Sequence, residues 1–277
     1  MSSKFSRAPL PPEALDAFFK IKGFDDFDDT KAAATTQVRS LRRGTRRQRR
    51  FAERLARCHK KHRCDSTACP VCFRKFRRVT IGQIVTLLKS LGIRIYRVSL
   101  VSADWSTPLG QLGAETINGF SEAFSKALAA SALKDAVIFG AWDFSVHVDK
   151  RSDDPPYYQP HLYLLVASAA PEKVVHATFS SLVTRSKDIP VPKRIGIPRY
   201  IWRAVNYSLK LKFKRRERRV GADGVMNTRY DKMRAAERRE LAVVLHELGI
   251  KGRLFMRGIK RSHWTYNLIS RFGSKNE

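Results

Sequence analysis

Acidic residues are scarce in this sequence. Its 277 residues include 25 Asp and Glu against 54 Lys and Arg, which leaves a formal net charge of +29 at pH 7. A chain this far from neutrality repels itself, and a bound polyanion would relieve the repulsion while releasing its own counterions. The charge balance therefore predicts a nucleic-acid-binding protein.

Long apolar segments are also missing. No run approaches the roughly 18 apolar residues of a membrane-spanning helix, and residues 1–10 lack the apolar core of a signal peptide. We therefore expect a soluble, cytoplasmic protein whose polyanion is not a membrane. With 43% apolar residues and 16 Phe, the chain still has enough apolar side chains to form a hydrophobic core. Its length suits one large domain or one domain with appendages.

Cysteine is absent outside residues 58–72. In a reducing compartment, four cysteines so close together bind metal more often than they form disulfides. The Cys-Pro-Val-Cys turn at residues 69–72 aims two thiolates at one tetrahedral centre. We predict a closed, structural zinc site, in which His59 or His62 is the alternative to one cysteine. The four expected ligands are Cys58, Cys64, Cys69 and Cys72.

Apolar periodicity predicts the elements of an α+β fold. Helical spacing marks residues 73–91, 112–133 and 171–184, and basic helices are expected at 39–56, 199–213 and 229–248. Strands are expected over residues 93–101, 137–148, 162–167 and 252–257. The order strand, helix, strand, strand, helix over residues 93–184 is the order that a ferredoxin-like antiparallel sheet requires.

Two of these strands carry polar residues on one face. Side chains two apart on a strand point the same way, so His161 lies with Tyr163, and Asp143 lies with His147 on the preceding strand. If the strands pair as a hairpin, Asp143 lies beside His161, and a carboxylate next to an imidazole suits a divalent cation. The alternative is a histidine that simply packs in a half-buried strand.

A tyrosine and a lysine share one face of the helix expected over residues 199–213. Tyr207 and Lys210 are three residues apart. A tyrosine hydroxyl attacks a phosphodiester when a metal polarises the phosphate and a cation steadies the developing charge. The alternative is a packed ring beside a solvated lysine, and the exposure of Tyr207 decides between the two.

Taken together, these segments resemble the HUH-type rolling-circle replication initiators of plasmids and phages. The resemblance covers about residues 50–215 and rests on the cysteine segment, Gly-Ala-Trp-Asp at 140–143, Pro-His-Leu-Tyr-Leu-Leu at 160–165 and Tyr207-x-x-Lys210. It implies that His161 and Asp143 hold Mg or Mn. It also implies that Tyr207 nicks one DNA strand and stays attached to the 5′ phosphate, with Lys210 as its cationic neighbour.

The sequence departs from the family pattern at two positions. The family usually reads His-hydrophobic-His, but the second histidine is Tyr163 here, and Gln159 stands where a further histidine is often found. A neutral phenol, with a pKa of about 10, is a poor ligand for a hard divalent ion. The metal site is then weak, recruits Gln159 or His147, or is lost.

Basic residues concentrate where a DNA strand is expected. Residues 199–219 carry nine Lys or Arg and one Glu, interleaved with aromatic residues, a composition that suits single strands because bases stack while phosphates pair with cations. The basic residues expected to bind DNA come from this segment and from residues 39–50: Arg199, Arg203, Lys212, Lys214, Arg215, Arg216, Arg46 and Arg47.

These observations and the resemblance predict a replication initiator that acts as a nicking-closing endonuclease on single-stranded or hairpin origin DNA. Its expected cofactors are structural zinc and catalytic Mg or Mn, and its possible partners are host replication proteins. We divide the chain into a lead-in (1–50), a zinc-binding segment with a helix (51–92), an HUH-like α+β nuclease domain (93–215) and a basic C-terminal extension (216–277). The alternatives are a non-catalytic, zinc-dependent DNA- or RNA-binding regulator with a degenerate site, and a structural component of a nucleoprotein assembly.

Overall fold

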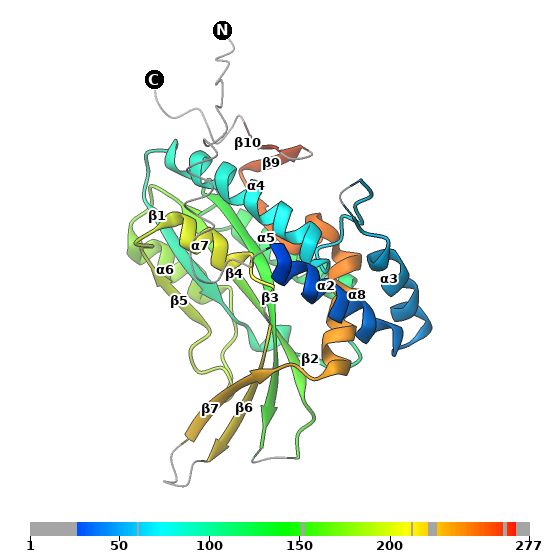
Figure 1. Cartoon of the computed structure of the whole chain (residues 1–277). Coiled ribbons are helices and arrows are strands. Elements are labelled where there is room, and N and C mark those ends of the chain that lie inside the picture. The colour runs from blue at the N-terminus through cyan, green and yellow to red at the C-terminus, as the bar shows by residue number, and fades with distance from the viewer. Residues whose placement is uncertain are drawn as a thin grey trace.

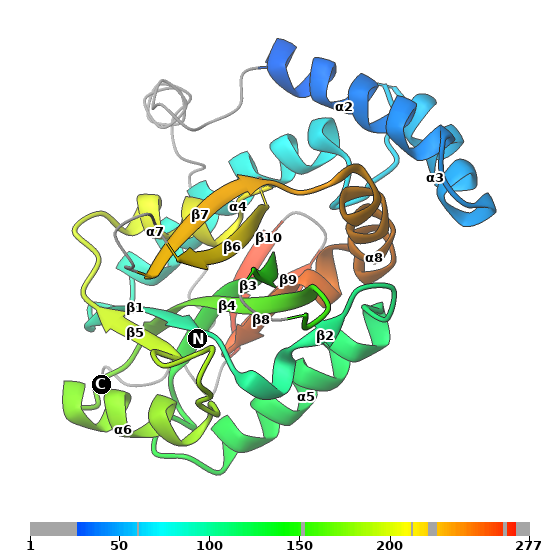
Figure 2. The same ribbon diagram turned by 90° about the horizontal axis from the view of Figure 1, so that it is seen from below.

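The fold is α+β, as the sequence predicts: helices cover an eight-stranded mixed sheet that curls on itself (Figures 1 and 2). This computed structural model describes residues 27–59, 61–150, 153–211, 213–220, 226–262 and 265–269. Most of the expected lead-in, residues 1–26, and the candidate DNA contact Lys212 lie outside the described residues. Within the described residues, no helix is both long and apolar enough to cross a membrane.

The centre of the sheet comes from the part of the chain where the sequence predicts strands and helices to alternate. Four strands lie there in the order β5-β1-β4-β3, and each is antiparallel to the strand beside it. The predicted order of strand, helix, strand, strand and helix is present, and β5 adds a fourth strand. The elements are β1 (Ile95–Leu100), α5 (Ala114–Ala129), β3 (Val137–Asp149), β4 (Tyr157–Ala167), α6 (Glu172–Ser181) and β5 (Lys193–Gly196).

Strands also form where the sequence predicts helix or loop. The helix expected over 199–213 ends at Ser208, and the basic run after it is β6, which pairs in parallel with β3. The sequence of β6 lacks the alternating apolar residues that reveal a half-buried strand, because the side chain that it buries is that of Arg215. The remaining strands are β2 (Thr107–Pro108), β6 (Lys214–Val220), β7 (Met226–Lys232), β8 (Leu254–Arg257), β9 (Ile259–Ser262) and β10 (Thr265–Leu268).

The predicted helix over residues 39–56 is broken after residue 42. Thr45 starts a new helix with a capping box, since its hydroxyl accepts from the Gln48 N–H and the Gln48 side chain accepts from the Thr45 N–H. The remaining helical elements are α2 (Phe27–Arg42), α3 (Arg46–Ala56), α4 (Pro70–Lys89), the 3₁₀ turn η1 (Ala103–Trp105), α7 (Ile201–Ser208) and α8 (Ala235–Arg253).

Two apolar layers enclose the sheet. On one face, Trp142 packs against Trp105 of η1 and Phe120 of α5, the α5 ring of Phe124 stacks on Phe179 of α6, and α8 closes this layer. On the other face, Phe139 belongs to an apolar cluster with residues of α4 and α7. Gly140 of β3 pairs with Leu164 of β4, and an added Cβ at this position would lie 2.1 Å from the carbonyl oxygen of Tyr163. The second apolar layer ends partway along β3, and a polar patch begins there.

Candidate metal centre and nucleic-acid cleft

The four cysteine side chains converge on one point. Cys58 follows α3, Cys69 caps the start of α4, and Cys72 lies in the first turn of that helix. All four sulfurs lie within 4.8 Å of one another, with separations of 3.4 Å for Cys58–Cys72, 3.7 Å for Cys64–Cys72 and 3.8 Å for Cys58–Cys69. Four sulfurs placed 2.3 Å from a common ion are about 3.8 Å apart. The cluster can therefore hold a metal ion.

The two neighbouring histidines do not join this group. His59 and His62 are exposed and pair with each other through their backbones, over 2.9 and 3.1 Å. The thiols hydrogen-bond to one another, which lowers the pKa of Cys72 and raises that of Cys69, so one sulfur of the four carries the negative charge most readily. An anionic sulfur is what a metal ion requires. The four-cysteine ligand set thus fits better than three cysteines and a histidine.

A polar patch continues the second face of the sheet beyond its apolar layer. Asp143 pairs directly with His161, as the hairpin interpretation predicts, and both residues are 2% exposed. Ser145 Oγ lies 2.9 Å from Nε2 of His161 and 3.0 Å from Nε2 of His147. Burial lowers the pKa of both imidazoles, that of His147 to about 3, so both rings are neutral at neutral pH. One hydroxyl thus links two uncharged histidines, of which His161 is buried and His147 is half-buried.

Lys210 reaches into this patch from the segment after α7. Its ammonium nitrogen lies 2.8 Å from Oδ2 of Asp143 and lies over the rings of Tyr163 and Tyr207, 5.2 and 4.8 Å from their centroids. The two rings meet edge to face with centroids 4.9 Å apart. Burial raises the pKa of the Asp143 carboxyl, and Lys210 partly offsets this rise. Three segments of the chain therefore bring Asp143, His161, Tyr163, Tyr207 and Lys210 together.

These donors do not match the divalent-cation site that the resemblance implies. One carboxylate oxygen of Asp143 already binds Lys210, and Nε2 of His161 binds Ser145. Oδ1 of Asp143 is buried without a hydrogen-bond partner among the described residues. Within the same residues, the cysteines form the one group of three or more His, Cys, Asp or Glu side chains close enough to share an ion. Mg and Mn prefer several oxygen ligands, which the residues around His161 do not provide.

Neither proposed substitute ligand completes the site. The Gln159 amide is buried and occupied: its Nε2 donates to the Ser102 carbonyl over 3.0 Å, and its Oε1 accepts from the Ser106 hydroxyl over 2.8 Å. His147 is bound to Ser145 rather than to Asp143. Gln159 therefore fastens the start of β4 to the segment after β1.

The polar patch forms the floor of a cleft of about 920 Å³ between the sheet and α7. Among the described residues that line it, seven are basic and one, Asp143, is acidic. Such a wall attracts a phosphate backbone. Besides Lys210, the basic residues of the wall are Arg97, Arg194, Arg199, Arg203, Lys214 and Arg216.

Exposed aromatic rings accompany these cations. Tyr200, Tyr207 and Tyr230 line the cleft and are 40%, 50% and 58% exposed. The guanidinium of Arg203 lies 4.9 Å from the Tyr200 ring centroid, and that of Arg216 lies 5.5 Å from the Tyr230 centroid. Rings this exposed are free to stack on bases. The exposure of Tyr207 also decides against the alternative in which its ring belongs to the core.

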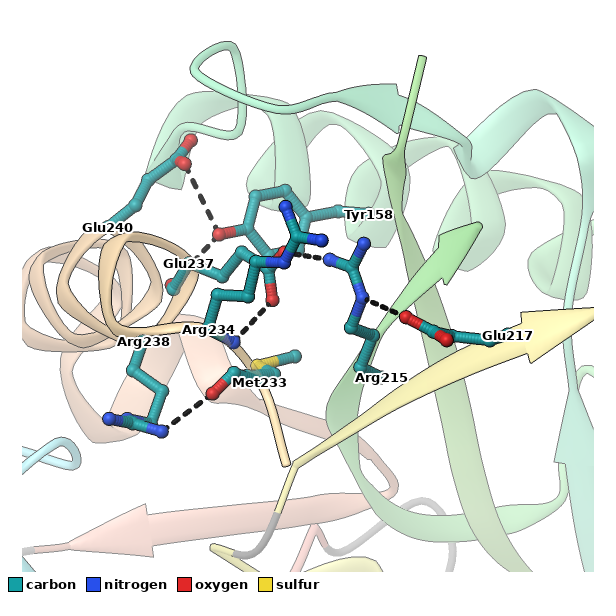
Figure 3. Close-up of polar contacts among 8 residues, drawn as sticks. All are labelled: Tyr158, Arg215, Glu217, Met233, Arg234, Glu237, Arg238 and Glu240. Atoms are coloured by element: carbon teal, nitrogen blue, oxygen red, sulfur yellow. Dashed lines mark hydrogen bonds and ion pairs between the residues drawn. The ribbon is translucent and has the colours of Figure 1, made fainter. Parts of the chain in front are cut away.

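The remaining candidate DNA contacts lie elsewhere. Arg46 and Arg47 are exposed on α3, away from the cleft lining, and Arg47 pairs with Glu247. Arg215 corrects an expectation. It is 3% exposed and its guanidinium binds Glu217 and Glu237, so it faces the interior rather than DNA (Figure 3).

Figure 3 shows the network in which Arg215 lies, between β6 and the start of α8. The Tyr158 hydroxyl donates to the backbone carbonyl of Glu237 over 2.9 Å and contacts Glu240 over 3.2 Å. The Arg234 N–H donates to the Glu237 carboxylate over 2.8 Å. The network anchors the end of the sheet to α8.

Sequence reasoning missed Arg253, at the end of α8. It is 1% exposed, its Nη2 donates to the backbone carbonyl of Lys210 over 2.5 Å, and its guanidinium lies 4.2 Å from the ring centroid of Phe73. Burial lowers its pKa to about 9, which leaves it charged at neutral pH. No spacing distinguishes it among the 54 basic residues.

Comparisons with protein-family models, curated proteins and solved structures found no match to this chain.

Proposed function

We propose that this protein nicks and rejoins single-stranded DNA through a covalent link between Tyr207 and a 5′ phosphate. The observation that carries the proposal is the meeting of Tyr207 and Lys210 with Asp143 and His161 in a basic cleft. Tyr207 is exposed in the cleft, and the ammonium that contacts its ring is fixed by a buried carboxylate. A nucleophile, a placed cation and a surface for phosphates are the parts that phosphoryl transfer requires.

In the proposed reaction, Tyr207 is the nucleophile and Lys210 is the cation that stabilises the reacting phosphate. The Tyr207 oxygen attacks the phosphorus, and the Lys210 ammonium, anchored on Asp143, lies where it stabilises the charge that develops on the phosphate oxygens. The 3′ oxygen leaves. Rejoining is the reverse attack by a 3′ hydroxyl, which releases Tyr207. His161 and Ser145 form the floor beneath the reacting group.

The topology supports an HUH-type, ferredoxin-like nuclease core. In the order β5-β1-β4-β3, the strand β4 lies between β1 and β3, and all neighbouring pairs are antiparallel. This is the split β-α-β arrangement of ferredoxin-like sheets. The parallel strand β6 extends the sheet beyond that arrangement.

A single zinc ion at the four cysteines is the second part of the proposal. The sulfur separations of 3.4 to 3.8 Å suit tetrahedral thiolate ligation. A site closed by four protein ligands leaves no position for substrate, so its role is to fold the segment. That segment docks on α8, where the Thr67 hydroxyl donates to the Leu245 carbonyl and the Phe51 ring stacks on His246 at 4.2 Å.

The test is a covalent adduct. A pool of random-sequence, single-stranded oligonucleotides labelled at the 3′ end is incubated with the protein, and labelled bands that survive SDS are counted. We expect an adduct with the wild type and none with Tyr207→Phe at retained DNA affinity. Tyr230→Phe removes a similarly exposed hydroxyl from the same cleft and is expected to retain the adduct.

An adduct that survives Tyr207→Phe would refute the assignment of the nucleophile. If the protein binds the pool but forms no adduct with it or with supercoiled plasmid DNA, the function is instead that of a non-catalytic, zinc-dependent DNA- or RNA-binding regulator. The observation that favours this alternative is Tyr163, which replaces a family histidine beside His161.

A further inference from the structure

We infer that the Lys210 ammonium takes the place of a divalent cation in this cleft, so that cleavage at Tyr207 needs no Mg or Mn. The inference rests on the proposed nicking activity and specifies its chemistry. It departs from the resemblance, which implies a metal-dependent reaction.

The first support is that the carboxylate of the site is already paired. Nζ of Lys210 lies 2.8 Å from Oδ2 of Asp143, whose side chain is 4% exposed. A divalent ion bound at the remaining oxygen, Oδ1, would lie close to this ammonium and be repelled by it, and an ion that displaced the ammonium would leave a partly buried Lys210 without its partner. Breaking such a pair is costly because the abandoned charge loses its compensation in a poorly solvated place.

The second support is the quality of the other donors. Position 163 supplies a phenol in place of an imidazole beside His161, and a phenol is a poor ligand for a hard divalent ion. The Ser145 hydroxyl is shared between His161 and His147. Of the described lining residues, Asp143 alone offers an anionic oxygen. One carboxylate is too few for an ion that binds through several oxygens.

The third support is the sign of the charge around the site. Seven basic residues line the cleft against one acid, so a dication is repelled where a phosphate is attracted. The same electrostatics that disfavour a metal favour the substrate. A fixed ammonium also has N–H donors left for phosphate oxygens after one is given to Asp143.

The fourth support is that Lys210 is held in place. The buried Arg253 donates to the Lys210 backbone carbonyl over 2.5 Å, and the rings of Tyr163 and Tyr207 flank the ammonium. A cation that is positioned before the reaction costs no reorganisation when charge develops. Arg253 is in this sense a positioning residue for Lys210.

The step balances without a metal. The bond from the Tyr207 oxygen to phosphorus forms as the bond from phosphorus to the 3′ oxygen breaks. The phenolic proton passes to solvent and the departing 3′ oxygen takes one up, so nothing is oxidised or reduced. Lys210 stays protonated and contributes charge alone.

The experiment follows adduct formation on the 3′-labelled single-stranded pool, in buffers freed of divalent ions by a resin. A soluble chelator is avoided because it would also strip the cysteine cluster. Protein with one equivalent of zinc, verified by metal analysis, is assayed with and without added Mn²⁺. We expect equal rates within about twofold, since no step depends on the ion. A rise of tenfold or more on adding Mn²⁺, an effect of roughly 1.4 kcal/mol, would overturn the inference and leave the nicking function intact. An adduct in neither buffer would refute the function and the inference with it.

Two variants separate the role of Lys210 from general charge. Lys210→Ala is expected to slow adduct formation at saturating DNA by about 100-fold or more, as for the loss of one preorganised donor. Lys214→Ala removes one charge from the rim of the same cleft and is expected to act mainly on DNA affinity. Similar losses of rate in the two variants would contradict the assignment.

A third variant restores the family pattern. Tyr163→His combined with Lys210→Ala removes the competing ammonium and adds an imidazole beside His161. We expect Mn²⁺ to stimulate this double variant and not the wild type. Stimulation of both to the same degree would show that the wild-type cleft already binds the ion.

Discussion

The cysteine cluster and the floor of the cleft are the two places where the sequence suggests a metal ion, and they differ in how their donors are arranged. At the cluster, four sulfurs lie within 4.8 Å of one another. In the cleft, the one carboxylate is paired with an ammonium 2.8 Å away, and basic residues surround it. Residue types that ligate metals are present at both sites, but only the first brings several of them to one point.

The difference shows that a metal site requires several ligand atoms close to one point and surrounding charges that do not repel a cation. Cys69 and Cys72 converge because a helix starts between them, at Pro70, where the sequence predicts a tight turn and a helix only from residue 73. Asp143 and His161 also meet as predicted, yet Lys210 comes from another part of the chain to pair with the carboxylate.

Loss of one thiolate should abolish metal binding at the cluster. Cys69→Ser is expected to reduce the zinc content from about one equivalent per chain to near zero and to unfold the segment, because structural zinc contributes about 10 kcal/mol or more. Metal analysis and thermal unfolding measure both effects. His62→Asn alters an exposed neighbour outside the ligand set and is expected to keep the zinc. Equal loss of zinc in the two variants would show that a histidine is a ligand.

Arg215 and Arg216 are neighbours on β6 with opposite roles. Arg215→Met is expected to lower the free energy of unfolding by about 3–5 kcal/mol, because it leaves Glu237 buried without its partner. Arg216→Met, which removes a cleft cation instead, is expected to leave stability nearly intact. Urea denaturation measures both variants. Equal stability losses would contradict the separation of a structural from a DNA-facing arginine.

Acid should destabilise the protein through the imidazoles that stay neutral in the folded state. The folded pKa of His147 is about 3 against an ordinary value of 6.5, so the folded state binds fewer protons between these pH values. Stability is therefore complete above pH 6.5 and is lost as the pH falls below it. Between pH 7 and pH 5 one such histidine costs about 2 kcal/mol. Urea midpoints at the two pH values should differ less in His147→Gln than in the wild type, and an identical difference would exclude this cause.

Single cations of the cleft should each have a small effect on DNA binding. Arg216→Ala is expected to weaken binding of a single-stranded oligonucleotide by about 1 kcal/mol and to reduce the slope of log affinity against log salt by about one. Arg219 is exposed on the same strand but does not line the cleft. Fluorescence anisotropy over a salt series compares the two alanine variants, and an equal loss in Arg219→Ala would mean that DNA does not follow the cleft.

The sequence predicts those helices and strands whose buried side chains are apolar. The helix α4 and the strands β3 and β4 follow from periodicity, and the pairing of Asp143 with His161 follows from the hairpin. The strand β6 does not, because its buried residue is Arg215, which is stabilised by Glu237 from a distant helix. The same limit applies to the site. The spacing marks Tyr207 and Lys210 as a pair, although α7 ends at Ser208 and Lys210 lies beyond it rather than on the same helix. Arg253 is not marked at all, because it acts through a contact with Lys210, 43 positions away along the chain.

The cleft holds the Lys210 ammonium where the resemblance implies a metal ion. Electron paramagnetic resonance of Mn²⁺ titrated with zinc-loaded protein distinguishes the two, because bound Mn²⁺ loses the sharp signal of the free ion. We expect the wild-type protein to leave the free-ion signal unchanged and the double variant Tyr163→His, Lys210→Ala to reduce it. Loss of about one equivalent of free Mn²⁺ with the wild type, abolished by His161→Ala, would show that the wild-type cleft binds the metal ion.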